Sequence, residues 1–191
     1  MADLRAAPLL RRDPLDGVPA ITARSRLAIE AAPRGARLVL RGSESAAIAA
    51  GQAFGLALPL AINTAATDDV RTAFRLGPDE WLLLAPQDQE KQVYDAIEAA
   101  VAEPHSLVDA SHRNVGILVS GSLAADVLAN GVMLDLDPAA FPPGMATRTL
   151  YVKAEIVLWR KGAQDFHIEV WRSFAAYMHG LLEEAAREYV K

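Results

Sequence analysis

The sequence of 191 residues contains no cysteine, and other features that mark common classes of protein are also missing. Without cysteine, disulfide bonds, thiolate nucleophiles and cysteine-bound zinc are all excluded. The four histidines, His105, His112, His167 and His179, show no H-x₃-H spacing, so no pair of them is placed to share a metal ion on a helix. We therefore expect no metal site.

Positive charge and long apolar runs are scarce as well. Acidic residues outnumber basic ones by 24 to 19, and no basic run with interleaved aromatic residues is present. Because binding to phosphates needs clustered Lys and Arg, we expect no nucleic-acid partner. No apolar run approaches the roughly 18 residues that a membrane-spanning helix needs, so we expect no membrane association. Asp3 and Asp13 interrupt the N-terminal arginines and no apolar signal segment follows them, which favours a cytoplasmic protein.

The first 26 residues have a composition of their own. They contain three prolines and five arginines, including Arg5, Arg11 and Arg12, and their apolar residues follow no clear period. This pattern predicts an extended N-terminal arm over residues 1–26, which is exposed unless a partner covers it. A frayed chain end is the alternative.

Two stretches of the remaining chain follow the same order of elements. The first predicts strands over 27–31 and 37–41, a helix over 44–54 capped by Ser43, a hairpin over 71–85 and a helix capped by Asp88. A shift of 79 residues places Gly42 on Gly121, and a shift of 85 places Gly77 on Gly162 and the helix cap Asp88 on Ser173, which is predicted to cap the last helix. The order strand, helix, hairpin, helix is therefore predicted twice.

These patterns predict an α+β fold. One half of such a protein would bury only one face of its sheet, so we expect two halves, about 27–104 and 105–191, to pack as a single domain over 27–191. Phe166, Ile168 and Val170 alternate with more polar residues, which predicts one inward and one solvent-exposed face for that strand. The last helix is predicted over about 174–188.

The densest group of reactive side chains is the polar corner from Asp109 to Asn114. Asp109, Ser111 and His112 suggest a catalytic triad, but on an extended strand His112 points away from Ser111, and no G-x-S-x-G motif is present. We expect Asp109 and Ser111 to hydrogen-bond the backbone of the turn instead. His167 and Glu169 could meet on one strand face, where a solvated sheet face is the expected outcome. No catalytic residue is predicted, and no glycine motif indicates a cofactor site.

Several short motifs carry a resemblance to a known family. The order Asp109-x-Ser111-His112-Arg113, a strand, Gly121 and Ala125-Asp126-Val127-Leu128 resembles the folate-binding module of the glycine-cleavage T-protein (aminomethyltransferase) superfamily. Narrower motifs resemble the gamma subunits of heterotetrameric sarcosine oxidase: Leu134–Asp137, Phe141-Pro142-x-Gly144 through Thr149, Lys153–Ile156 and Phe166–Phe174. The match is dense between about 107 and 182.

The resemblance implies two halves packed as one T-protein-like body. It further implies a subunit of a complex that oxidises sarcosine to glycine, with hydrogen peroxide and, from tetrahydrofolate, methylene-tetrahydrofolate as products. The partners would be alpha, beta and delta subunits, and these would carry FAD, FMN, NAD and tetrahydrofolate, with no cofactor in this chain.

One departure from the T-protein pattern concerns catalysis. Where the transferases have an acidic pair with a catalytic Asp, this chain has Lys153-Ala154-Glu155, in which only Glu155 is acidic. This favours a non-catalytic structural or assembly subunit, the alternative being a free-standing folate-binding protein like the aminomethyltransferases. As docking residues we predict Arg5, Arg11 and Arg12 of the arm, with His112 and Arg113 of the polar corner, because the arginine fork pairs with carboxylates.

Overall fold

The computed structural model describes residues 12–190, and its strands form two fully antiparallel sheets. The first sheet has the order β4 (Thr64–Thr67), β5 (Thr72–Gly77), β6 (Glu80–Pro86), β3 (Gly35–Arg41), β7 (Ser106–Asp109). The second has the order β1 (Ile21–Thr22), β2 (Ala28–Ala31), β8 (Asn114–Ser120), β11 (Asp165–Trp171), β10 (Ala154–Arg160), β9 (Ala146–Tyr151).

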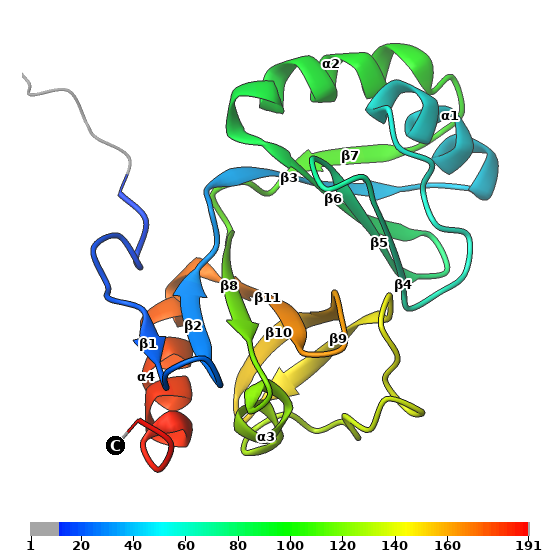
Figure 1. Ribbon diagram of the computed structural model, residues 1–191. Coiled ribbons are helices and arrows are strands. Elements are labelled where there is room, and N and C mark those ends of the chain that lie inside the picture. Colours follow the sequence, from blue (N-terminus) through cyan, green and yellow to red (C-terminus); the bar gives the residue numbers. More distant parts are fainter. Residues whose placement is uncertain (1–11, 191) are drawn as a thin grey trace, which may run out of the picture.

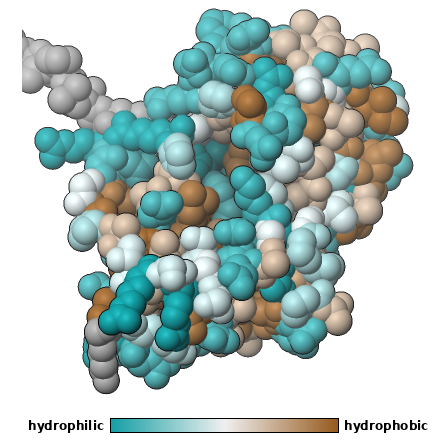
Figure 2. All heavy atoms as spheres, viewed as in Figure 1, coloured by the Kyte–Doolittle hydropathy of each residue, from teal (hydrophilic) through white to brown (hydrophobic). Residues whose placement is uncertain are grey.

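Helices cover the outer face of each sheet, so that the two sheets lie between two helical layers (Figure 1). On the first sheet lie α1 (Glu44–Phe54) and α2 (Glu90–Ala100), and on the second lie α3 (Ala124–Ala129) and α4 (Ala175–Ala186). Figure 2 shows a largely hydrophilic face in this view, interrupted by hydrophobic patches. Within residues 12–190, no helix is long and apolar enough to cross a membrane. The fold is thus a mixed α/β arrangement, consistent with the predicted class.

Strict alternation along the central strands supplies both the helix-facing cores and the contact between the sheets. Under α1 and α2 lie buried residues of β3 and β6, including Leu38, Leu40, Trp81 and Leu83. Under α3 and α4 lie the three residues predicted to face inward, Phe166, Ile168 and Val170, with others of β8 and β10. The opposite faces meet in a third, smaller cluster: Phe74, Leu82, Ala146, Val157 and Trp159. Both faces of these strands are therefore buried.

The second face of β11 corrects a prediction. We expected His167 and Glu169 to lie on a solvated sheet face, but Glu169 is almost fully buried and His167 is half-buried. The reason is that the first sheet packs over this face. Alternation in a sequence distinguishes two faces of a strand, but it does not say whether water or another sheet covers the more polar one.

Helix capping follows the prediction at one of three positions. Ser43 caps α1, and its hydroxyl accepts a hydrogen bond from the amide of Ala46. The predictions for Asp88 and Ser173 are wrong, because each lies inside a short 3₁₀ turn, Gln87–Gln89 or Arg172–Phe174, before α2 or α4 begins. Neither helix has a side-chain cap.

The two halves of the chain exchange one strand each. β2 precedes β3 in the chain but pairs with β8 in the second sheet, whereas β7 precedes β8 but pairs with β3 in the first sheet. The strand orders β4-β5-β6-β3-β7 and β9-β10-β11-β8-β2 correspond. Gly121 has φ +107°, however, and no positive φ occurs at Gly42. Superposition of these two glycines therefore stays a prediction.

Part of the predicted arm is described, and this part packs on the second sheet. Leu15 and Ala23 are buried in its core, and β1 pairs with β2. Residues 12–26 are thus partly folded rather than wholly exposed, because some of their apolar side chains pack into the core of the second sheet.

Candidate functional site at the polar corner and the seam between the sheets

The polar corner is the bend at which the chain leaves the first sheet and enters the second. The carboxylate of Asp109 accepts a hydrogen bond of 2.8 Å from the amide of Ser111, and the Ser111 hydroxyl accepts one of 2.9 Å from the amide of Arg37. Burial acts to raise the pKa of Asp109, but the hydrogen bonds from Ser111 outweigh it and lower that pKa. Ser111 is only 2% exposed. Asp109 thus bonds the backbone of the turn, as expected, whereas the Ser111 hydroxyl bonds the backbone of β3 instead of that of the turn.

This geometry also argues against a triad. A nucleophilic hydroxyl must reach a substrate and have a base beside it, whereas the Ser111 hydroxyl is buried against the backbone of β3. His112 is exposed at the surface of the corner. Asp109 and Ser111 therefore hold the bend between the sheets.

A buried ion pair joins the two sheets next to this corner. Arg37 of β3 donates two hydrogen bonds to Glu169 of β11, from Nε at 2.5 Å and from Nη2 at 3.0 Å. His167 Nε2 lies 2.8 Å from the same carboxylate. Burial acts to raise the pKa of Glu169, but Arg37 and His167 outweigh it and lower that pKa to about 2. Glu169 is therefore a charged residue committed to holding the sheets together.

Gly116 of β8 makes room for this cluster. It lies opposite Glu169 in the antiparallel register, and a β-carbon at this position would lie 3.2 Å from Glu169 Oε1 and 3.1 Å from His167 Nε2. It would also lie 2.7 Å from the β-carbon of Ala32. The side chains of His167 and Glu169 thus occupy space that the side chain of any larger residue at position 116 would need.

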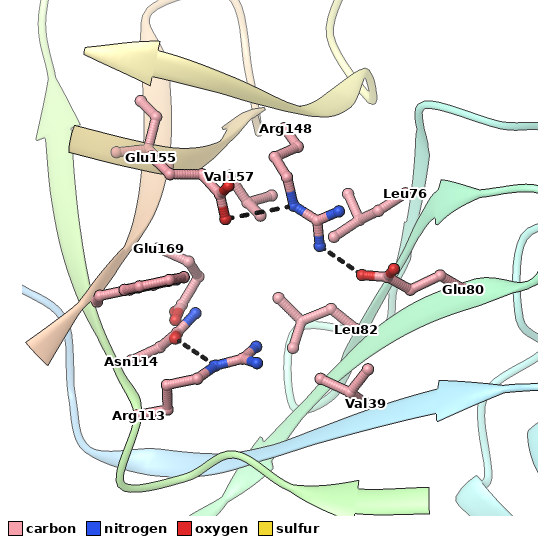
Figure 3. A pocket seen from close by; sticks show the side chains of 12 residues that line it. Val39, Leu76, Glu80, Leu82, Arg113, Asn114, Arg148, Glu155, Val157 and Glu169 are labelled. Carbon is pink, nitrogen blue, oxygen red and sulfur yellow. Dashed lines mark hydrogen bonds and ion pairs between the residues drawn. The ribbon is translucent and has the colours of Figure 1, made fainter. Parts of the chain in front are cut away.

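A second set of charges crosses the seam further along. Glu80 of β6 accepts hydrogen bonds from Arg41 of β3 and from Arg148 of β9, and Arg148 also lies 3.7 Å from Glu155 (Figure 3). Glu155, the sole acidic residue where a transferase would have its pair, is 48% exposed at its side chain and faces Arg148. Its position is that of a surface carboxylate paired with Arg148.

Two spaces flank the ion pair, and Glu169 lines both. The narrower one, of about 20 Å³, lies among Arg113, Asn114, Glu155 and Trp171 and has room for about one water molecule (Figure 3). The wider one is a groove of about 960 Å³ bordered by Arg37, Trp159 and His167. Within residues 12–190, no three side chains of His, Asp or Glu come together as metal ligands.

The structure brings some of the predicted docking residues together. Arg5 and Arg11 lie outside the described residues. Arg12 and Arg113 both contact Arg172, whose side chain donates to the Arg12 carbonyl and whose amide donates to the Arg113 carbonyl at 2.7 Å. His112 is exposed beside Arg113. Three segments far apart in the sequence thus meet at one surface.

Sequence reasoning missed the residues that join the sheets: Arg37, Glu80 and Arg148. A signal was available at Arg37, which stands inside the mostly apolar β3, and at Glu80, which begins the apolar β6. Such residues are rarely buried unless they are paired, so they indicate a partner. The neighbouring sequence does not, however, indicate which residue each of these side chains pairs with.

Proteins of similar sequence identify the family. The model of the family described as "Sarcosine oxidase, gamma subunit family" matches residues 41–188. The gamma subunit of sarcosine oxidase from Corynebacterium sp. (strain U-96) is 33% identical over 157 residues, covering 81% of this chain and 75% of that protein. The gamma subunit from Arthrobacter sp. is 33% identical over 135 residues, covering 70% and 65%.

Solved structures agree with this assignment. A chain of the heterotetrameric sarcosine oxidase from Corynebacterium sp. U-96 superposes with a TM-score of 0.87 at 26% identity, covering 95% of this chain and 97% of that one. Aminomethyltransferase T of the glycine cleavage system from Bartonella henselae shares the fold, with a TM-score of 0.65 at 14% identity over 84% of this chain and 46% of that one. The resemblance to the transferase therefore holds for the fold, the resemblance to the gamma subunits is confirmed, and the chain belongs to the gamma subunit family of sarcosine oxidase.

Proposed function

We propose that this protein is a non-catalytic assembly subunit of a heterotetrameric sarcosine oxidase. The complex oxidises sarcosine to glycine in the cytoplasm, releases hydrogen peroxide and forms methylene-tetrahydrofolate when tetrahydrofolate is present. Family membership and the likeness to a chain of a heterotetrameric enzyme support the place in a complex. The other members of that complex are alpha, beta and delta subunits.

The observation that best supports a non-catalytic role is that the Glu169 carboxylate is already bound by other side chains of this protein. A catalytic acid or base has to exchange protons near the working pH. Glu169 is instead fully buried, bound by Arg37 and His167, and held ionised by a pKa of about 2. Ser111 is equally committed to the backbone, and Glu155 lies at the surface beside Arg148.

Cofactor binding is assigned to the partners. On this proposal FAD, FMN, NAD and tetrahydrofolate are held by the other subunits, and the isolated chain binds none of them. A visible flavin spectrum of the purified, extensively washed chain would contradict this part of the proposal.

Turnover by the assembled enzyme tests the non-catalytic role. Glu155→Gln and Asp109→Asn should leave sarcosine oxidation nearly unchanged wherever the variant subunit is incorporated. A loss of more than about a hundredfold in rate, or about 2.7 kcal/mol in activation free energy, with assembly intact would show that one of them is catalytic.

Docking is proposed to use the N-terminal arm, with Arg5, Arg11 and Arg12, and the polar corner at His112 and Arg113. Co-expression of the tagged chain with the other three subunits tests the complex itself. Deletion of residues 1–11 tests the arm. It spares Leu15 and Ala23, which belong to the core of the second sheet.

A further inference from the structure

An exposed tryptophan stands beside the polar corner. Trp171 is the last residue of β11, directly opposite Asn114 in the register, on the face that also carries His167 and Glu169. Those two residues are covered by the first sheet, whereas Trp171 is 44% exposed and lines the rim of the narrow pocket. The fold thus leaves a large aromatic surface in contact with water at the end of the seam.

Two arginines lie next to this tryptophan in the chain or in the strand register. Arg172 follows it in the chain, and Arg113 precedes its register partner Asn114. The Arg172 amide is bonded to the Arg113 carbonyl, and the Arg172 side chain to the Arg12 carbonyl. Residues from the arm, the corner and the end of β11 are therefore held at one surface.

The two arginines of this surface have no ion-pair partner among the residues that the structure describes. Among residues 12–190, neither Arg113 nor Arg172 has a carboxylate within 4.0 Å, although the protein carries a net charge of −5. The side-chain contact of Arg113 is a 3.1 Å bond from Nε to the amide oxygen of Asn114. By contrast, Arg41 and Arg148 are both bound to Glu80.

We propose that Trp171, Arg113 and Arg172 form the anchor by which a partner subunit binds, and that the partner presents an acidic surface with an apolar pocket. Tryptophan and arginine are the residue types that contribute most to protein interfaces when they become desolvated at the centre. The arginine fork binds carboxylates in pairs, which gives the contact an orientation as well as a charge. This inference rests on the proposed function and names the chemistry of the partner.

The test uses the complete complex, with all four subunits co-expressed and the affinity of this subunit measured at low and high salt. Trp171→Ala should weaken binding by about 30-fold, the loss typical of a central interface residue. Arg113→Glu should weaken it at low salt, and the effect should shrink at high salt because an exposed charge pair is screened. The second variant alters only a surface side chain, so it remains informative if the first one folds poorly.

Matched controls lie elsewhere on the surface. Met133→Ala truncates an apolar side chain that is 73% exposed, and Arg187→Glu reverses a charge near the end of α4. Both should bind as the wild type does. If the wild-type complex forms and the Trp171 and Arg113 variants bind no worse than these controls, the anchor lies elsewhere and only this inference is overturned. If the wild type itself does not assemble with the other subunits, the proposed function and the anchor are both overturned.

Discussion

Replacing Arg37 by methionine should destabilise the protein far more than the loss of one surface contact would. The substitution keeps the volume of the side chain but removes the guanidinium that binds Glu169 at 2.5 and 3.0 Å. Glu169 then remains buried with His167 as its remaining partner. Breaking a buried ion pair costs about 3–5 kcal/mol, because a charge is left without its counterpart.

The lowered pKa of Glu169 indicates an energy of similar size for the ion pair. Its fall from 4.5 to about 2 corresponds to about 3 kcal/mol of stabilisation of the charged form at neutral pH. Because His167 Nε2 still lies 2.8 Å from the carboxylate, we expect a loss in the free energy of unfolding of about 3 kcal/mol, the lower end of the range for a broken buried ion pair. The loss should shrink on acidification, because without Arg37 the carboxylate has a higher pKa and is protonated more readily.

Urea unfolding of the purified chain, followed by circular dichroism at pH 7, measures this loss. Arg41→Met is the matched control, since the Arg41 guanidinium is half exposed and should contribute less than about 1 kcal/mol. The double variant Arg37→Met with Glu169→Leu should recover most of the stability, because neither charge is then buried alone. The reasoning is refuted if Arg37→Met costs no more than Arg41→Met, or if the double variant is as unstable as the single one.

Three further changes probe the same structure. Acidification from about pH 4.5 to pH 2 should lower the free energy of unfolding, because the pKa of Glu169 is lower in the folded than in the unfolded protein. Glu169→Gln should flatten the dependence of this free energy on pH in that range, and an unchanged dependence in the variant would contradict the assignment. Gly116→Ala should lower the free energy of unfolding by about 1–3 kcal/mol, because the added methyl group crowds the ion pair. Gly180→Ala, at a position in α4 with no neighbour within 4 Å, should raise it by up to about 1 kcal/mol. Equal effects of the two variants in urea unfolding would refute the crowding. Ser43→Ala should cost about 1 kcal/mol through the lost cap of α1, and no change in the unfolding midpoint would show that the cap is dispensable.

Much of the fold was determined by local patterns in the sequence. Alternating apolar residues placed the strand of Phe166, and the turn at Gly77 placed the hairpin of β5 and β6, because both depend on neighbouring residues alone. Ser43 was recognised as a cap because its hydroxyl acts within one helical turn. The motifs between about 107 and 182 likewise sufficed to indicate the family.

What covers each strand face was decided only by the tertiary structure. Arg37 and Glu169 are 132 positions apart, so no local pattern joins them, and the polar face of β11 looked solvated until the first sheet packed over it. The exchange of β2 and β7 between the sheets has the same origin, since strand pairing depends on backbone hydrogen bonds that are alike for every sequence. Side-chain periodicity therefore determines which segments form strands, whereas the packing of the whole chain determines which strands lie next to each other.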